Sequence, residues 1–269
     1  MRTLWLLGTV AVMTLVMGSL VILAELLGVA HRPGGIYDWA PRIWARTIIR
    51  AAGVRVELHG IETFATAGHH VVMANHVSWF DIPVMILTVP RFAAVAKQEL
   101  SRIPVFGRAA GKVGVVYLDR ENRKAAFEAY ETAAEAVRDG ASVVVFPEGT
   151  RGTEYALRPF KKGPFVLAAA SQAEIIPVVI HGTLPLGRGK QWRVDASSDG
   201  VVHVHVLPPV SAAGTSYADR SLLASQVHAR MSALLASHYG VSPRVASTPL
   251  DGASSDVPAA TTAALLDTP

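Results

Sequence analysis

The chain of 269 residues contains no cysteine. This absence excludes a disulfide-stabilised fold, a zinc site built from thiolates and a cysteine nucleophile. Charged residues are also few, at 17 %, whereas hydrophobic residues make up 51 %. That apolar content is enough for a sizeable core, and the length suits one large domain with appendages.

The sequence also lacks a continuous basic stripe. Its formal net charge is only +4, and its arginines concentrate near the N-terminus. Anionic lipid or phosphate is therefore a better match than nucleic acid, and we expect no nucleic-acid partner. A G-x-S-x-G nucleophile elbow is missing as well, which argues against a lipase-like serine hydrolase.

Charge is nearly absent from the first apolar run, Thr3 to Leu27, where Glu25 is the one charged residue. About 20 apolar residues suffice for a helix that crosses a bilayer. We therefore expect residues 1–30 to form a membrane anchor helix. A cleaved signal peptide is the alternative, although the run is longer than a usual signal h-region. Because several arginines follow the run and only Arg2 precedes it, the positive-inside rule places the main domain on the cytoplasmic side of the cytoplasmic membrane.

Residues 31–52 form a second segment with membrane character. In the helix expected from Ile36 to Arg50, Trp39, Ile43 and Trp44 lie on one side, and arginines repeat every fourth residue on another. This pattern is typical of an interfacial amphipathic helix at the lipid headgroups. An amphipathic helix packed on the domain explains it equally well, and both interpretations can hold together.

Beyond residue 52, short β-rich runs alternate with helical ones. The expected strands are Val54 to Leu58, Val71 to Ala74, Phe92 to Ala96, Val113 to Leu118, Ser142 to Phe146, Ile175 to Ile180 and Val201 to Leu207. The expected helices are Ile82 to Thr88, Arg102 to Ala110, Arg123 to Arg138, Pro164 to Ala173 and Leu222 to His238. This alternation predicts an α/β fold, a mostly parallel sheet flanked by helices, over residues 53–241. Residues 242–269 contain few bulky side chains and are expected to be disordered.

A histidine and an aspartate follow the second expected strand five residues apart, as His76 and Asp81. On a continuous helix five residues advance about 500°, so the two side chains can meet only if the chain bends between them. A strand-to-helix turn would supply that bend. His76 could then act as a general base, with Asp81 fixing its tautomer and stabilising the imidazolium. The alternative is that Asp81 merely caps the helix that begins at Ile82.

Further polar residues end other strands. Gly114 to Arg120 closes one strand with Arg120, and Phe146 to Arg151 closes another with a carboxylate, a glycine and a guanidinium. A third strand contains Ile176-Pro177-Val178. In parallel sheets ligands bind beyond the carboxyl ends of the strands, where the His76 and Glu148 segments would lie.

In this order and spacing the segments resemble the four motifs of the 1-acylglycerol-3-phosphate O-acyltransferase (lysophosphatidate acyltransferase) family of glycerolipid acyltransferases. The resemblance spans roughly Val71 to Gly182, and Asn75-His76-x4-Asp81 together with Phe146-Pro147-Glu148-Gly149-Thr150-Arg151 is its most specific pair. Lys97 to Leu100, Ile103 to Gly107 and Phe160 to Gly163 also resemble the family. Gln98 stands where a charged residue is frequent, and Ile176 replaces a commoner valine.

The resemblance implies transfer of an acyl chain from acyl-CoA or acyl carrier protein to the sn-2 hydroxyl of 1-acylglycerol 3-phosphate, giving phosphatidate. It implies His76 as the base and Asp81 as its orienting partner. It implies substrate-phosphate contacts by Lys97, Arg120, Glu148, Gly149, Thr150 and Arg151. The acyl-donor or acyl-chain region would include Lys161, Lys162 and Pro177. The expected partners are a lysophospholipid acceptor, the acyl donor as co-substrate and membrane lipid, without a cofactor or a metal.

Some alternatives stay open at this point. The acceptor could be glycerol 3-phosphate or another lysolipid, and a membrane-tethered phospholipid-binding protein without turnover is a further possibility. Planar arginine forks suit phosphate, but a carboxylate does not, so Glu148 is expected to orient Arg151, a backbone group or the glycerol hydroxyl. The pair Lys161-Lys162 could contact acyl-CoA phosphates or form a solvated turn.

Two further histidines, His203 and His205, are expected on one face of a strand. Metal sites use such pairs, but the sequence identifies no third ligand, so a solvated strand face is the preferred interpretation.

Overall fold

The computed structural model describes residues 2–66, 70–187 and 200–243. Within these ranges one sheet has the strand order β1-β7-β6-β2-β5-β3-β4. Its strands are β1 (Arg55–His59), β2 (His70–Ala74), β3 (Phe92–Lys97), β4 (Val115–Leu118), β5 (Ser142–Val145), β6 (Glu174–His181) and β7 (Val201–Val206). All neighbouring strands are parallel except β6 and β7. The predicted α/β fold with a mostly parallel sheet is confirmed.

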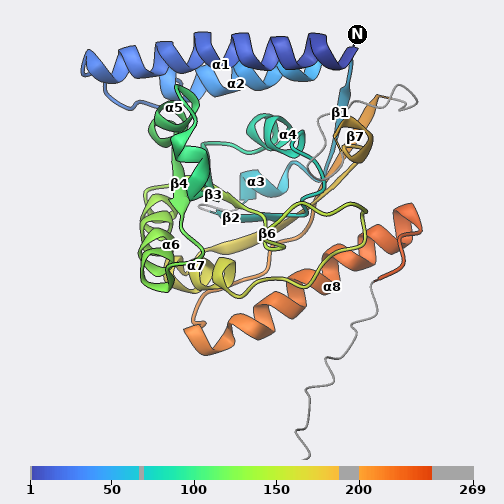
Figure 1. Cartoon of the computed structure of the whole chain (residues 1–269). Helices are drawn as coiled ribbons and strands as arrows, with labels where there is room; N and C mark the ends of the chain where they lie inside the picture. Colours follow the sequence, from blue (N-terminus) through green and yellow to red (C-terminus); the bar gives the residue numbers. More distant parts are fainter. Residues whose placement is uncertain (1, 67–69, 188–199, 244–269) are drawn as a thin grey trace, which may run out of the picture.

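Helices cover both faces of this sheet (Figure 1). One side carries α1 (Arg2–Leu26), α2 (Ile36–Ala51), α3 (Thr63–Thr66), α4 (Asp81–Thr88) and α5 (Phe106–Lys112). The other side carries α6 (Arg123–Arg138), α7 (Gly163–Ser171) and α8 (Arg220–Tyr239). Three 3₁₀ turns, Gln98–Arg102, Leu184–Leu186 and Tyr217–Asp219, join elements in the described part of the chain.

The central strands are buried on both faces because they carry continuous apolar runs. In β2, Val72 and Ala74 pack with the core under α2 and α4, whereas Val71 and Met73 pack with the core under α6, α7 and α8. The residues that follow a central strand are therefore held in position by the packed helices on both faces of the sheet.

Helix α6 forms with the bounds predicted for it, because it has clear signals at both ends. The Asn122 side chain accepts hydrogen bonds from the backbone N–H groups of Lys124 and Ala125, both at 3.1 Å. At the other end Gly140 adopts a φ of +89°, which favours glycine and ends the helix.

The helix predicted from Arg102 to Ala110 is confirmed only from Phe106 onward, and its predicted start is wrong. A 3₁₀ turn ends at Arg102, the chain is extended at Ile103, and α5 begins only at Phe106. Pro104 explains the break, since the residue before a proline is disfavoured in the helical region. Val105, with a φ of +61°, completes the change of direction.

The apolar helix α1 lies lengthwise along α2 (Figure 1). Leu6, Val21 and Ala24 are buried on its inner side, and near its end Glu25 forms ion pairs with Arg108 and Lys112. The exposed large apolar side chains of α1 and the turn after it are Leu4, Trp5, Val12, Leu15, Val16, Leu20, Leu23, Leu26, Leu27 and Val29. From Thr3 to Leu26 the helix is long and apolar enough to cross a membrane.

Helix α2 is packed between α1 and the domain. Ala45 and Ile48 are fully buried, and the Trp44 indole N–H donates to the hydroxyl of Thr14 in α1 at 2.9 Å. Arg42 donates to the carbonyl of Val89 at 2.9 Å, so this guanidinium is already used inside the protein. The packed-helix interpretation therefore describes most of α2, and its interfacial role for residues 31–52 stays a prediction. The predicted tail, 242–269, lies outside the described residues from residue 244 onward.

Candidate active site

The turn from β2 to α4 brings His76 and Asp81 together. Nδ1 of His76 lies 2.7 Å from Oδ2 of Asp81, since the strand ends at Ala74 and the helix begins at Asp81. The predicted bend between the two residues is confirmed. The aspartate is not a helix cap: Phe80 occupies the cap position, and the Asp81 side chain turns back toward the preceding loop.

The Asp81 carboxylate is fully buried and fully hydrogen-bonded. Besides His76 it accepts the backbone N–H groups of Val77 and Ser78, both at 2.9 Å, through Oδ2. Its Oδ1 accepts the hydroxyl of Thr183 at 2.6 Å. Four donors around a buried carboxylate hold its position, so the imidazole bonded to it has one orientation.

The imidazole of His76 is covered on one side by the Phe146 ring, with centroids 4.1 Å apart and an angle of 21° between the planes. The side chain retains 15 % exposure. Because Nδ1 faces Asp81, the exposed edge presents Nε2, the nitrogen that can accept a proton from a substrate.

The Glu148 carboxylate binds the backbone of His76. Its Oε1 accepts the backbone N–H of His76 at 2.9 Å, and its Oε2 accepts the backbone N–H of Arg158 at 3.2 Å. Burial raises the pKa of Glu148 to about 7, although these two N–H donors oppose the shift. Of the three partners expected for this carboxylate, the structure shows a backbone group.

The loop after β5 also contains Gly149, which lies beside two basic side chains. Gly149 has a φ of +78°, and its carbonyl accepts a hydrogen bond from Nη1 of Arg120. A Cβ added at Gly149 would lie 3.3 Å from the Lys161 side chain and 3.7 Å from the Arg120 guanidinium. Glycine is therefore favoured here by the backbone conformation and by the close approach of the Lys161 side chain.

Arg151 is half-buried close to the pair. Burial lowers the pKa of its guanidinium, and the Asp81 carboxylate opposes that shift. The next residue, Gly152, donates its N–H to the carbonyl of His76 at 2.7 Å, which ties the Arg151 segment to the histidine. Thr150 accepts from Nη1 of Arg158 at 2.5 Å.

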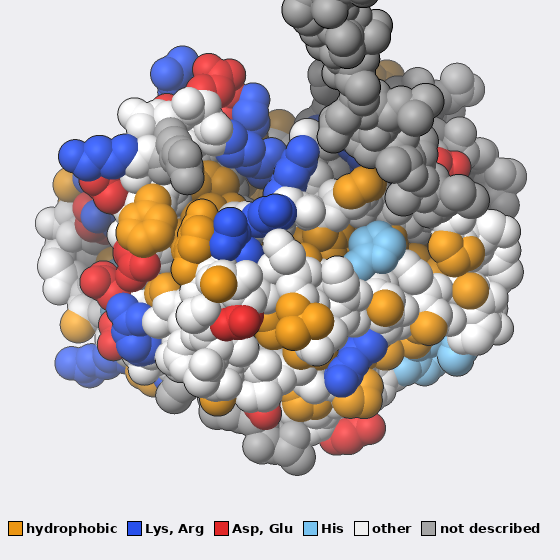
Figure 2. All heavy atoms as spheres, turned by 90° about the horizontal axis from the view of Figure 1, so that it is seen from below, with side chains coloured by type: hydrophobic (Ala, Val, Ile, Leu, Met, Phe, Trp, Pro, Cys, Tyr) orange, Lys and Arg blue, Asp and Glu red, His pale blue; other side chains and the backbone are white. Residues whose placement is uncertain are grey.

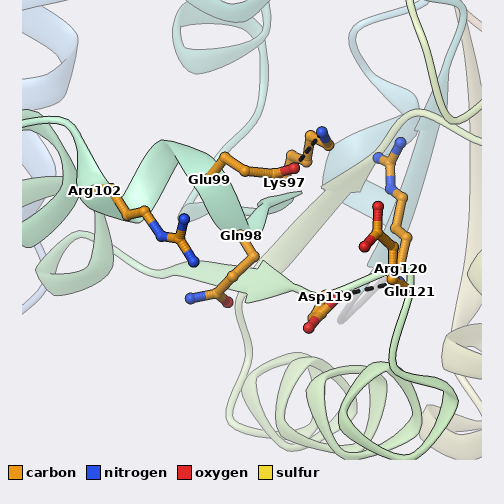
Figure 3. Close-up of a pocket in the computed structure, with 7 residues that line it drawn as sticks. All are labelled: Lys97, Gln98, Glu99, Arg102, Asp119, Arg120 and Glu121. Carbon is orange, nitrogen blue, oxygen red and sulfur yellow. Dashed lines mark hydrogen bonds and ion pairs between the residues drawn. The ribbon is translucent and has the colours of Figure 1, made fainter.

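Lys97 and Arg120 line a pocket of ≈ 220 Å³ at the ends of β3 and β4 (Figure 3). Its other lining residues are Gln98, Glu99, Arg102, Asp119 and Glu121. Lys97 is ion-paired with Glu99, so one of its interactions is already made. Basic and acidic side chains alternate around this pocket, in contrast to the more basic neighbourhood of Gly149.

Two predicted residues lie apart from the pair. Lys162 is exposed at the start of α7. Pro177 is buried within β6 beside Met73 of β2, so it belongs to the sheet interior. Lys161, in contrast, is held near Gly149, and its N–H donates to the carbonyl of Pro147 at 2.8 Å.

Sequence reasoning missed Thr183 and Arg158. Thr183 follows the end of β6, one of the strands whose carboxyl ends form the site, and this position was the available signal. Arg158 lies in a loop without a pattern, and only the folded chain brings its backbone to Glu148.

Comparisons with known proteins show which proteins the chain is similar to. The sequence model of the Acyltransferase family matches residues 55–181. The 1-acyl-sn-glycerol-3-phosphate acyltransferase alpha of Mus musculus is 35 % identical over 181 residues, which are 66 % of this chain and 63 % of that protein. A protein named 1-acyl-sn-glycerol-3-phosphate acyltransferase from Borreliella burgdorferi is 32 % identical over 49 % of this chain and 53 % of its own length.

Among solved structures, the 1-acyl-sn-glycerophosphate (LPA) acyltransferase PlsC from Thermotoga maritima superposes with a TM-score of 0.71. It is 25 % identical, and the match covers 87 % of this chain and 95 % of that one. Sequence and fold are thus both similar to those of acyltransferases. Within that class the chain is similar to the 1-acylglycerol-3-phosphate O-acyltransferases, both in sequence and in fold. The chain spans about 63 % of the length of the mammalian relatives that it matches.

Proposed function

We propose that this protein transfers a fatty acyl chain from acyl-CoA or acyl carrier protein to the sn-2 hydroxyl of 1-acylglycerol 3-phosphate, giving phosphatidate. One observation carries the proposal: the 2.7 Å contact between His76 and a buried, fully hydrogen-bonded Asp81 at the carboxyl end of a parallel sheet. Its relatives' names supply the substrate class.

In the proposed reaction Nε2 of His76 accepts the proton of the glycerol hydroxyl as its oxygen attacks the thioester carbonyl. The C–O bond forms, the tetrahedral intermediate collapses, and the C–S bond breaks. The imidazolium then returns the proton to the departing thiolate. Asp81 keeps Nδ1 protonated throughout and offsets the imidazolium charge.

The acceptor phosphate would bind beside the pair, through Arg151, Arg120 and Lys161. Arg151 is close to the pair through Gly152, and the other two side chains meet at Gly149. Guanidinium forks match phosphate oxygens bidentately. Glu148 acts as a positioning residue, since its two oxygens are used by the backbone of His76 and Arg158.

The membrane role follows from α1. Its outer side exposes a row of large apolar residues over the length of the helix, while its inner side packs on α2. We propose that this outer side contacts lipid, which would bring the catalytic domain to an acceptor residing in the bilayer. The arginine-rich segment after α1 supports a cytoplasmic position for the domain.

The test is an acceptor panel with the purified full-length protein in detergent. Lysophosphatidate, lysophosphatidylglycerol and glycerol 3-phosphate are each offered with oleoyl-CoA and palmitoyl-CoA, and lipid products are separated. We expect phosphatidate from lysophosphatidate. Acylation of another acceptor alone would replace the proposed substrate, and no acylation of any acceptor with either donor or with acyl carrier protein would overturn the enzyme assignment.

A further inference from the structure

The edge of the sheet where β1 pairs with β7 gathers carboxylate and imidazole side chains. The parallel register places Glu57 opposite His203 and His59 opposite His205. Residues two apart on a strand share one face, so all four side chains project on the same side of the sheet. That side is the one covered by α8, and Figure 2 shows histidine side chains reaching the surface of this face.

Three ligand atoms of this cluster converge. Nε2 of His59 lies 3.3 Å from Nδ1 of His203, and the same Nδ1 lies 3.4 Å from Oε2 of Glu57. One ligand atom from each residue lies within 4.8 Å of the other two. Ligands held about 2.0–2.2 Å from a tetrahedral zinc ion are separated by roughly 3.3–3.5 Å. Two of the three separations therefore already have the length that a bound ion requires.

We propose that Glu57, His59 and His203 bind a divalent transition-metal ion, with Zn²⁺ as the expected occupant. Two imidazoles and one carboxylate form a donor set that suits zinc and its neighbours rather than Ca²⁺ or Mg²⁺. Glu57 and His203 are partly exposed, with side chains at 39 % and 30 %, so an ion can enter from solvent and Glu57 can rotate to close the third separation. A tetrahedral zinc ion would have a fourth position, which a water molecule could fill.

Binding requires a change of tautomer at one histidine. Without metal, His59 and His203 share one hydrogen between Nε2 and Nδ1, so one of these nitrogens is protonated. A metal ion takes the lone pairs of both, and that hydrogen moves to the other nitrogen of its own ring. In a neutral imidazole the second nitrogen of the donor ring carries no hydrogen and can take it, whereas the acceptor ring already carries its hydrogen on its other nitrogen.

Neighbouring side chains position the ligands without competing for the ion. The His205 ring stacks on His59 at 4.4 Å between centroids, and its Nε2 lies 2.7 Å from the Tyr239 hydroxyl of α8. Arg55 pairs with Oε1 of Glu57 at 3.2 Å, which leaves Oε2 for the metal. The site is thus assembled from two strands and supported by one helix end.

A metal here would connect the edge strand β1 to β7 through side chains, in addition to the backbone ladder. Glu57 and His203 are far apart along the chain, so only the folded protein brings the ligands together. A metal ion that binds the folded state and not the unfolded chain stabilises the fold. This inference is independent of the proposed acyl transfer, since the cluster shares no residue with the His76 site.

The test uses full-length protein in detergent, stripped with EDTA and dialysed. Zn²⁺ is titrated by calorimetry, the bound metal is counted by elemental analysis, and thermal unfolding is followed with and without Zn²⁺. We expect one equivalent and a higher unfolding midpoint with metal. His59→Ala and His203→Ala should each weaken Zn²⁺ binding by at least about 10- to 100-fold. Mutation of a residue that only contacts a metal ligand already lowers affinity by this factor, and loss of a ligand itself should cost no less.

Matched histidine controls locate the binding. His31→Ala removes an exposed histidine near the start of α2, and His76→Ala removes the other carboxylate-paired imidazole. Both should retain one equivalent of zinc. Co²⁺ absorption provides a second readout, with a tetrahedral spectrum expected for wild type and lost in Glu57→Gln, whose fold is checked by circular dichroism. Equal zinc uptake by wild type and the folded His59→Ala/His203→Ala double variant would overturn the proposal, as would loss of uptake in His76→Ala.

Discussion

Two carboxylate–imidazole pairs lie in the described part of the chain, one in the middle of the sheet and one at its edge. His76 and Asp81 are 2.7 Å apart, with side chains 15 % and 0 % exposed, whereas His203 and Glu57 are 3.4 Å apart and 30 % and 39 % exposed. The central carboxylate accepts two backbone N–H groups and a hydroxyl as well as the imidazole. The edge carboxylate is held only by side chains in the interactions described for it. Similar chemical groups are thus suited to different tasks: fixed donors favour proton transfer by one tautomer, and adjustable ones favour a metal.

The sharpest way to break this comparison is to remove the central imidazole. General-base catalysis is worth about 10² to 10⁴ in rate, so His76→Ala should lower kcat by that factor. Lysophosphatidate binding, measured by equilibrium dialysis in detergent, should persist. Asp81→Asn should also be severe, since an amide neither enforces the tautomer nor offsets the imidazolium charge. His31→Ala serves as the control, and an His76→Ala enzyme within a few-fold of wild type would remove the proposed base.

The buried Glu148, which binds the backbone of His76, should make the stability of the protein depend on pH. Its folded-state pKa of about 7 exceeds the ordinary 4.5, so the folded protein keeps a proton that the unfolded chain releases. Its contribution to stability is therefore most favourable below pH 4.5 and is lost as the pH rises to 7, by an amount on the order of 3 kcal/mol. Glu148→Gln should flatten the pH dependence of the thermal unfolding midpoint across this window. Glu128→Gln, at an exposed carboxylate of α6, should leave the slope unchanged, and an equal slope in Glu148→Gln would contradict the raised pKa.

The proposed contact between Arg151 and the acceptor phosphate is tested by a lysine substitution, which keeps the positive charge and removes the planar guanidinium. Arg151→Lys should raise the apparent KM for lysophosphatidate by about 10- to 30-fold, because one charge-assisted hydrogen bond is lost. The KM for acyl-CoA should change much less. Arg138→Lys on the far end of α6 is the matched control. Equal increases in both KM values would indicate that Arg151 acts through the fold rather than on the acceptor phosphate.

The smallest expected effect comes from one hydrogen bond to the central carboxylate. Thr183→Val keeps the side-chain shape and removes the donor to Oδ1 of Asp81, which should lower kcat by about tenfold. Thr88→Val is the control, since the Thr88 hydroxyl is also buried but bonds to the carbonyl of Val84. If both variants lose activity equally, the effect reflects general packing and not the support of Asp81.

Much of this architecture is predictable because local patterns decide it. Each strand is a short β-rich run, and the ends of the observed strands differ by only one or two residues from the predicted ones. Helix α6 follows from Asn122 and Gly140, and the bend between His76 and Asp81 follows from helical geometry. The error at Arg102 to Ala110 arose because a short apolar run was given more weight than Pro104.

The remaining features depend on which strands become neighbours, and a single sequence does not show this. Thr183 contacts Asp81 across 102 positions, and Glu57 meets His203 across 146. His203 and His205 do share a face as predicted, but their additional partners come from β1, which is far from β7 in the sequence and next to it in the sheet. The sequence alone identifies no third ligand, because Glu57 and His59 reach His203 only through the pairing of β1 with β7.

Asn75 gives the active site a dependence on strand alignment. Its side-chain amide donates to the carbonyl of Ile180 at 2.9 Å and accepts the N–H of the same residue at 2.7 Å, one residue after β2 has ended. A side chain thus imitates a peptide group and adds one more rung between β2 and β6. A slip of one residue between these strands, about 3.3 Å, would break both bonds and shift the neighbouring imidazole by the same distance. The register between β2 and β6 therefore also determines the position of His76, and an error in this register would displace the proposed catalytic base.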